Sequence, residues 1–124
     1  MPVVVITGAT GNIGRKLRAH LEAKGGYELR LIDHEARGDQ DITVADLASY
    51  DPAWTSLFDG ADAVVHLAGL PKNQASWAEI VPPNIDGLFN IYLAAAKAGV
   101  KRVVFASSVW AVYGNRFEDW PHDP

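Results

Sequence analysis

The stretch TGATGNIG, residues 7–14, places three glycines in eight positions directly after the apolar run 3–6. A β-branched run of this kind is typical of a strand that is buried on both faces. From Asn12 onward, Ile13, Leu17, His20 and Leu21 recur at helical spacing, which predicts that they form the inward face of a helix. Glycine costs about 0.5–1 kcal/mol inside a regular element, so its repetition here indicates a geometric demand. The stretch therefore predicts a tight loop that joins a buried strand to a helix.

Each glycine of this loop has a physical reason to be there if the loop binds a dinucleotide. Gly8 permits the tight turn, Gly11 lets the backbone approach a pyrophosphate, and Gly14 lets the helix pack closely against the strand. The N-terminus of the following helix supplies unpaired N–H groups and a partial positive charge for the anion. The alternative is a glycine loop with a structural role only.

A candidate partner for the ribose of that dinucleotide is Asp33. It ends a second predicted strand, YELRLID at 27–33, and lies 19 residues after Gly14. A carboxylate at this place accepts hydrogen bonds from the adenosine ribose hydroxyls and repels a 2′-phosphate, which favours NAD over NADP. Asp33 could instead be a helix-capping or loop aspartate, and the proximity of Arg37 leaves NADP open as the less favoured cofactor.

The rest of the chain alternates between strand and helix patterns. Further strands are predicted within 41–47, 61–69 and 101–108, and helices within 52–60 and 76–99, the latter broken around Pro82 and Pro83 because proline removes a donor and clashes with the preceding turn. Alternating strands and helices require right-handed crossovers and a parallel sheet. The expected fold is therefore α/β, a Rossmann-type doubly wound parallel sheet of about five strands in the order 3-2-1-4-5. We expect one domain over residues 1–124.

Composition narrows the classes of function. The chain has 124 residues, 48% hydrophobic and 21% charged, with a net charge of −4. An acidic balance argues against nucleic-acid and membrane-surface partners, which favour basic patches. The absence of cysteine excludes disulfides and thiolate chemistry. No apolar stretch approaches about 18 residues and the start does not resemble a signal peptide, so a cytoplasmic location is expected.

Several motifs together resemble a known family, the extended short-chain dehydrogenase/reductases. They are TGATGNIG at 7–14, ADL at 45–47, HLAG at 66–69, NIDGLFNIYLAAAKAGVKRVVFASS at 84–108 and VYG at 112–114. These are the NAD-dependent epimerase/dehydratase proteins, which act mainly on nucleotide sugars and related carbohydrates. HLAG followed by FASS is also similar to uronate dehydrogenases. The resemblance covers essentially the whole chain and implies NAD as cofactor and a small carbohydrate as substrate.

The resemblance also implies roles for individual residues. Asp46 would accept a hydrogen bond from the adenine amino group, although the sequence around it alone indicates a helix cap. Asn84 would lie near the nicotinamide, although capping a helix after Pro83 is an equally physical role. Ser108 would orient a substrate hydroxyl. The full set of implied cofactor contacts is Gly8, Thr10, Gly11, Asn12, Ile13, Gly14, Asp33, Asp46, Leu47, Leu67, Ala68, Gly69, Asn84 and Ser107. His66 has no second ligand at a metal spacing, so no metal site is expected.

The sequence departs from the family pattern in two ways. In many relatives, the serine or threonine that hydrogen-bonds the substrate lies four residues before the tyrosine of YG. Here that position is Val109, so the role of binding the substrate would have to pass to Ser108. The family also uses a tyrosine as general acid/base with a lysine four residues later, and the residues four after each tyrosine here are Leu31, Trp54, Ala96 and Phe117. Since this pair is absent, the chain alone is not expected to be catalytically competent.

Three hypotheses follow. The chain could be the cofactor-binding part of a longer oxidoreductase or epimerase that ends before the last strands and the substrate domain, or a naturally short, non-catalytic NAD-binding module. It could also be an interaction protein with a purely structural glycine loop. Because the predicted helix over 84–98 is apolar on more than one face, a homodimer or higher self-association is expected.

Overall fold

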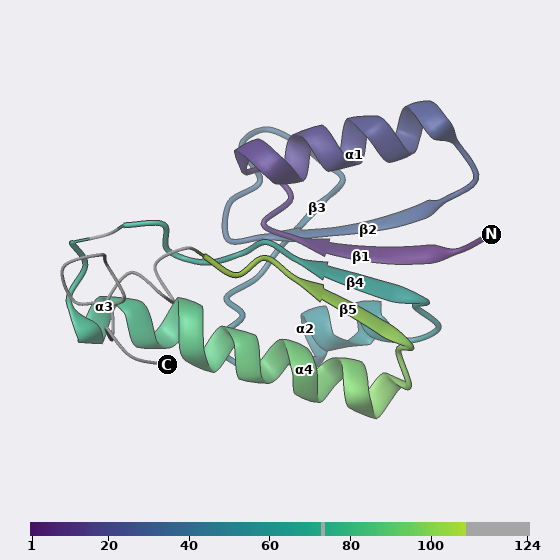
Figure 1. Ribbon diagram of the computed structural model, residues 1–124. Helices are drawn as coiled ribbons and strands as arrows, with labels where there is room; N and C mark the ends of the chain where they lie inside the picture. Colours follow the sequence, from purple (N-terminus) through teal and green to yellow (C-terminus); the bar gives the residue numbers. More distant parts are fainter. Residues whose placement is uncertain (73, 109–124) are drawn as a thin grey trace, which may run out of the picture.

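The computed structural model describes residues 1–72 and 74–108 (Figure 1). The strands are β1 (Val3–Thr7), β2 (Glu28–Asp33), β3 (Ile42–Val44), β4 (Ala63–His66) and β5 (Arg102–Phe105). The helices are α1 (Asn12–Lys24), α2 (Pro52–Thr55), α3 (Trp77–Ile80) and α4 (Gly87–Ala98). A 3-10 turn, η1 (Ser56–Phe58), extends α2, and a π-helical segment, η2 (Val81–Asp86), joins α3 to α4.

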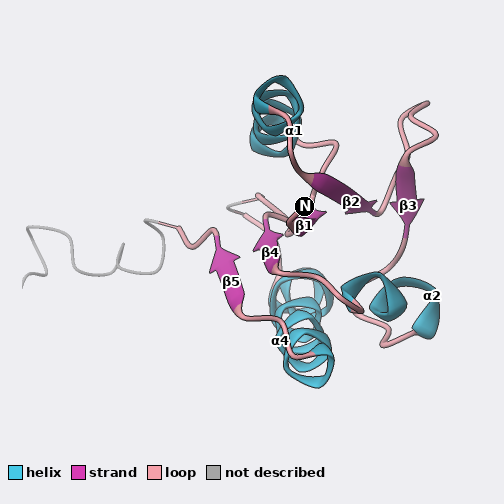
Figure 2. Ribbon diagram, turned by 90° about the vertical axis from the view of Figure 1, so that its right-hand side faces the viewer, coloured by secondary structure: helices cyan, strands magenta, loops and turns pink. Residues whose placement is uncertain are grey.

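The strands form one parallel sheet in the order β3-β2-β1-β4-β5, which confirms the predicted architecture and strand order. Helix α1 covers one face of the sheet, while α2 and α4 cover the other (Figures 1 and 2). Because all the strands run the same way, their carboxyl ends meet at a single edge. The loops that follow β1, β2 and β4 therefore lie together there.

Each face of the sheet has its own core. On the α4 side, the fully buried Trp54, Phe58 and Ile91 pack on Val5 and Val64 of the central strands. On the α1 side, residues of β1 and β2 meet the half-buried side chains of α1; this cluster is Val4, Ile6, Ala9, Leu31 and Ile42, with Leu17 and Leu21 against it. Large aromatic side chains supply much of the buried apolar area on the α4 side.

The helical face predicted for α1 is only partly correct. Leu17 and Leu21 pack against the core, but Ile13 is 61% exposed and His20 is also exposed. Ile13 lies in the first turn of the helix, beyond the ends of the strands, so no sheet residue lies beneath it. It lines the cleft described below instead.

The predicted interruption at Pro82 and Pro83 is not a break in the helix. The backbone stays helical from α3 to α4 and widens into the π-helical segment η2 at the two prolines. Proline lacks an N–H, so the ordinary ladder cannot continue there, and the wider turn accommodates both rings without ending the helix. Among the described helices, none is long and apolar enough to cross a membrane.

Candidate functional site

A cleft of about 650 Å³ opens at the carboxyl ends of β4 and β5. Its walls come from the loop after β4, from the residues after β5, from η2 and from the first turn of α1. The lining residues are Ile13, His66, Leu67, Ala68, Gly69, Leu70, Pro71, Lys72, Ile80, Asn84, Phe105, Ala106, Ser107 and Ser108. The sheet topology therefore brings together residues that are almost a hundred positions apart in the sequence.

The glycine loop beside this cleft has the geometry that its spacing predicts. Gly8 has a positive φ of 69°, and a Cβ there would lie 2.7 Å from the backbone N of Ala68. A Cβ on Gly14 would lie 2.2 Å from the carbonyl oxygen of Gly8, so α1 and the end of β1 touch through backbone atoms. Around Gly11 the space is open apart from the Gly8 oxygen at 3.2 Å. Gly8 and Gly14 are thus required by packing, whereas Gly11 leaves room for a ligand.

The first turn of α1 offers unused hydrogen-bond donors. Its N-cap, Gly11, has no side chain that could cap the helix. Within residues 1–72 and 74–108, no hydrogen bond joins the N–H groups of Asn12, Ile13 or Gly14 to another residue. Three free N–H groups at the positive end of a helix dipole form a binding surface for an anion such as a phosphate.

Asp33 lies at the end of β2 and its carboxylate is almost fully buried. Oδ2 accepts hydrogen bonds from the backbone N and the hydroxyl of Thr10, both at 2.9 Å, and Oδ1 accepts from the backbone N of His34 at 2.7 Å. Burial alone would raise the pKa of Asp33, but the hydrogen bonds from Thr10 and His34 outweigh it and lower the pKa below its usual value. Asp33 is therefore an ionised acceptor that is anchored to the glycine loop, not a helix cap.

Thr7 and His66 face each other across the β1–β4 pairing and organise the end of β4. The Thr7 hydroxyl lies 2.6 Å from Nδ1 of His66 and accepts from the backbone N of Leu67 and of Ala68, both at 3.2 Å. A hydroxyl that accepts twice has its own hydrogen left to donate, so Nδ1 is the acceptor and the proton of the neutral ring lies on Nε2. The ring also stacks on Phe105, with centroids 5.9 Å apart.

Burial lowers the pKa of His66 to about 4. The imidazole is therefore neutral at physiological pH. It helps to shape the turn at Leu67 and Ala68, and that turn contacts Gly8 of the glycine loop.

The two residues predicted near the adenine follow β3. Asp46 caps a turn rather than a helix, because its Oδ1 accepts from the backbone N of Ala48 at 3.0 Å and the next helix begins only at Pro52. Leu47 is buried in the core on the α4 side. The buried amide of Asn90 on α4 donates to the carbonyl oxygens of Leu47 and Ala48, at 2.8 and 3.1 Å. This loop is therefore held in place by α4.

Asn84 does not cap a helix, because it lies inside η2. Its Oδ1 accepts from the backbone N of Leu70 at 2.6 Å, and its Nδ2 donates to the Leu70 oxygen at 3.2 Å. Both halves of the amide thus bind one residue of the loop after β4. A Cβ on Gly69 would lie 3.0 Å from Asn84 Oδ1, so this glycine permits the close approach.

Ser107 and Ser108 follow β5 and line the cleft, as predicted for residues at the carboxyl end of this strand. Val109 and the VYG motif at 112–114 lie outside the described residues. The structure thus brings the predicted residues of the loops after β4 and β5 into one cleft. Asp33 is the last residue of β2 and the turn at Asp46 follows β3, so both lie on the other side of the glycine loop.

Sequence reasoning overlooked two residues of this site, Thr7 and His34. A threonine at the end of an otherwise apolar buried strand is a signal that could have identified Thr7, because a buried hydroxyl needs partners. The contact of His34 with Asp33 follows from the local loop conformation and has no comparable signal. In the described part of the chain, no group of three or more histidine, aspartate or glutamate side chains could hold a metal ion.

A scan against protein families matches residues 4–123 to the model described as "NAD dependent epimerase/dehydratase family". The chain belongs to this family. This match agrees with the resemblance to the extended short-chain dehydrogenase/reductases that the motifs indicate, and the chain is also similar to proteins named uronate dehydrogenase. The glycine loop, the acid at the end of β2 and the strand order thus occur in a member of a family that is described as NAD-dependent.

Two curated relatives show the range of named activities. L-arabinose 1-dehydrogenase (NAD(P)(+)) of Haloferax volcanii is 38% identical, with 87% of this chain and 41% of the relative covered. Uronate dehydrogenase of Pseudomonas putida is 41% identical, with 85% of this chain and 40% of the relative covered. The chain thus spans about two fifths of the length of the curated relatives it matches.

A solved structure shows the same fold. A mutant of uronate dehydrogenase from Agrobacterium tumefaciens, complexed with NAD, superposes with a TM-score of 0.75 at 35% identity. The match covers 87% of this chain and 41% of that one. The sheet and helices described here therefore correspond to a portion of that enzyme.

Proposed function

We propose that residues 1–124 form a single NAD-binding domain of an oxidoreductase that acts on a sugar, sugar acid or nucleotide sugar. The observation that carries the proposal is the free first turn of α1 beside Gly11, with the ionised Asp33 anchored next to it. The named activities of the relatives, which include dehydrogenation of L-arabinose and of uronates, support the carbohydrate class of substrate.

The described residues fit NAD along the carboxyl edge of the sheet. The pyrophosphate would bind the N–H groups of Asn12, Ile13 and Gly14 without a side chain at Gly11 in the way. Asp33 would accept from the adenosine ribose, and the turn at Asp46 would face the adenine. NADP is less favoured, because a 2′-phosphate would be repelled by the Asp33 carboxylate.

The nicotinamide half fits the 650 Å³ cleft between the loops after β4 and β5. Small residues at Ala68 and Gly69 allow close approach, and Asn84 holds that loop through Leu70. Ser108 would orient a substrate hydroxyl at the mouth of the same cleft. When bound, NAD would supply the hydride acceptor for oxidation of that hydroxyl.

NAD binding is tested by replacing Gly11 with leucine. A Cβ at this position meets only the Gly8 oxygen at 3.2 Å, so the fold should survive, while the side chain would occupy the space assigned to the pyrophosphate. We expect the unmodified chain to bind NAD in calorimetry and Gly11→Leu to bind at least about a hundredfold more weakly, because the ligand would lose charge-assisted hydrogen bonds.

The matched control is Ala19→Leu, which adds the same bulk on an exposed position of the same helix. It should bind NAD as the unmodified chain does. Asp33→Ala should weaken NAD and narrow its advantage over NADP. Failure of the unmodified chain to bind NAD would refute the proposal and favour an interaction module with a structural glycine loop, and preference for NADP would refute the assigned role of Asp33.

A further inference from the structure

Arg18 joins α1 to the loop between β2 and β3, which spans residues 34–41. Its guanidinium donates through Nη1 to Oδ2 of Asp39 and through Nη2 to Oδ2 of Asp41, the latter at 2.7 Å. Its Nε donates at 2.7 Å to Glu22, one turn further along the same helix, and this contact helps to orient the guanidinium. The Arg18 side chain is only 21% exposed. The loop is therefore docked on α1 by a network of ion pairs, which contributes more than an isolated surface pair.

Asp39 also organises the loop itself. Its Oδ1 accepts from the backbone N of Asp41 at 2.9 Å, and its own backbone N donates to the oxygen of Ala36 at 2.9 Å. The hydrogen bond from Asp41, together with the Arg18 guanidinium, holds the pKa of Asp39 below its usual value. Asp39 is thus ionised at neutral pH, and its contact with Arg18 joins two full charges.

The turn that Asp39 closes is strained at Arg37. Its two central residues, Arg37 and Gly38, both have positive φ, 49° and 81°. Within the described residues, Arg37 is the one residue other than glycine with a positive φ. Glycine adopts this conformation freely, whereas a residue with a Cβ adopts it at a cost and needs contacts that hold it there. The docking of Asp39 on Arg18 is such a contact, because it fixes the residue at which the turn closes.

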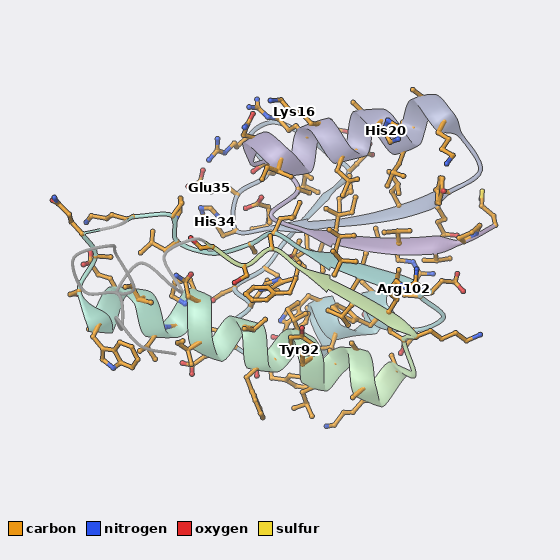
Figure 3. All side chains as sticks on the ribbon, in the orientation of Figure 1. Lys16, His20, His34, Glu35, Tyr92 and Arg102 are labelled. Atoms are coloured by element: carbon orange, nitrogen blue, oxygen red, sulfur yellow. The ribbon has the colours of Figure 1, made fainter. Side chains whose placement is uncertain are left out.

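The docked loop lies beside the proposed adenosine site. It begins at His34, directly after the Asp33 carboxylate that we assign to the ribose, and Figure 3 shows His34 and Glu35 below the N-terminal part of α1. The glycine loop, which leads into α1, contacts the same carboxylate through Thr10. Because Arg18 lies on α1, its ion pairs fix the spacing between the two loops that border this site.

We propose that Arg18 is a positioning residue for the adenosine half of the cofactor, acting through the loop at 34–41. The inference rests on the proposed NAD site. With the ion pairs in place, the loop is held in its binding position before the ligand arrives. Without them the strained turn is free to relax, and the apparent affinity falls in proportion to the fraction of chains that keep the loop in place.

The test is calorimetric titration of Arg18→Met, which keeps the apolar stem of the side chain and removes its ion pairs. We expect this variant to bind NAD about three- to tenfold more weakly than the unmodified chain, the loss that one charge-assisted contact represents. ADP, which carries the adenosine half, should lose the same factor. Nicotinamide mononucleotide carries the other half and should bind both chains equally well, whereas a general effect of the lost charge would weaken all three ligands.

A second substitution separates positioning from a general loss of stability. Arg37→Asn makes the centre of the turn Asn-Gly, the pair preferred where both central residues have positive φ. Added to Arg18→Met, it should tighten NAD binding by at least about twofold, because the turn no longer stores strain. The matched control is Lys16→Met, which removes an exposed positive charge on the side of α1 away from the sheet and should bind NAD as the unmodified chain does (Figure 3).

The outcomes separate this inference from the proposed function. Unchanged NAD affinity in Arg18→Met, an equal loss for nicotinamide mononucleotide, or no recovery on adding Arg37→Asn would overturn the role of Arg18 and leave the NAD site intact. An unmodified chain that binds no NAD would refute the NAD site and this inference with it. Circular dichroism establishes that each variant is folded. Arg18→Lys, which keeps one ion pair at a time, should show a smaller loss and replaces Arg18→Met if that variant does not fold.

Discussion

At the scale of single residues, His66 makes the stability of the fold sensitive to acid. Its ring is 1% exposed, its Nδ1 accepts from Thr7, and burial lowers its pKa to about 4. In the unfolded chain a histidine titrates near 6.5, so the unfolded state binds more protons than the folded state between these values. The stabilisation is therefore complete above about pH 6.5 and is lost as the pH falls toward 4.

We expect the free energy of unfolding to fall between about pH 6.5 and pH 4, by up to roughly 3 kcal/mol, the value of the shift at 1.4 kcal/mol per unit. Urea denaturation at a series of pH values measures this slope. His66→Asn, which keeps an acceptor near the Nδ1 position and cannot titrate, should flatten it, while His20→Asn should not. An unchanged slope in His66→Asn would show that another group causes the acid sensitivity.

Site residues could be predicted where the local backbone requires a particular residue type. Gly8 and Gly14 were predictable because a positive φ and a backbone contact leave few alternatives to glycine. Asp33 was predicted as an acceptor, but its attachment to Thr10 was not, because that contact depends on how the loop after β1 folds over β2. The prediction of Ile13 on the inward face was wrong, since periodicity does not say where the sheet ends.

At the scale of elements, the contact between α4 and the loop after β3 supports the adenine side of the site. Asn90 is buried, with 9% of its surface exposed, and its amide donates to the carbonyl oxygens of Leu47 and Ala48. Replacement by alanine would leave these carbonyls without their donor in a largely dry environment. The turn at Asp46 directly precedes them, so its position depends on the same contact.

We therefore predict that Asn90→Ala lowers the free energy of unfolding by about 1–3 kcal/mol and also weakens NAD binding. The control is Ala96→Ser, an exposed position of the same helix, which should change neither quantity by much. Chemical denaturation and calorimetry measure the two effects. A variant with native stability would contradict the supporting role assigned to Asn90.

The sequence predicted which segments form strands or helices more reliably than it predicted whether a helix is interrupted. Short apolar runs bounded by polar or glycine-rich segments predicted all five strands, and the central strands β1 and β4 are the ones rich in buried valine and isoleucine. Pro82 and Pro83 predicted an interruption, yet the chain remains helical through η2. The missing N–H groups are a local property. The π-helical segment is also held by a tertiary contact, the hydrogen bonds of Asn84 with Leu70, which the local sequence does not reveal.

At the scale of the whole molecule, an apolar stripe along α3, η2 and α4 is left uncovered in the described structure. It comprises Trp77, Ile85, Phe89 and Tyr92, which are 73%, 49%, 67% and 45% exposed. The opposite side of α4 carries the buried Ile91 and Ala94. The sequence predicted this uncovered apolar surface, because the helix is apolar on more than one face and a sheet can cover only one of them.

We predict that the chain self-associates through this stripe, as a dimer or a higher oligomer, because large exposed apolar patches mark interaction surfaces. Sedimentation velocity at tens of micromolar should show the associated species. Phe89→Glu should shift the chain toward monomer, whereas Arg15→Glu, on the helix that covers the other face of the sheet, should not (Figure 2). A monomer at these concentrations in the unmodified chain would contradict the prediction.

The fold was predictable to the level of strand order. The glycine loop at 7–14 indicated the first crossover, and the alternation of strands and helices indicated the remaining ones. Substrate identity was not predictable in the same way. The cofactor edge is built from backbone N–H groups and glycines, whose geometry leaves a sequence signature. Substrate recognition depends on particular side chains rather than on backbone geometry, and the stretch from Val109 onward lies outside the described residues.

Turnover by the 124-residue chain would require a positioned base. Positioned proton transfer typically contributes about 10²–10⁴-fold to a rate, and the family supplies it through a tyrosine with a lysine four residues later. None of the four tyrosines here has that lysine. Ser108 could orient a substrate hydroxyl, but orientation alone does not supply a positioned base for the proton released on oxidation. His66 does not replace it, because its pKa of about 4 makes it a poor base and its Nδ1 is held by Thr7.

We therefore expect the purified chain to bind NAD without oxidising a carbohydrate. The measurement is the absorbance of reduced cofactor during incubation with NAD and a panel of uronic acids, aldoses and nucleotide sugars. The rate should not exceed that of Gly11→Leu, which serves as the control because it lacks the proposed pyrophosphate site. A faster rate in the unmodified chain that is lost in Ser108→Ala would refute the prediction and show that a base other than the tyrosine–lysine pair acts beside Ser108.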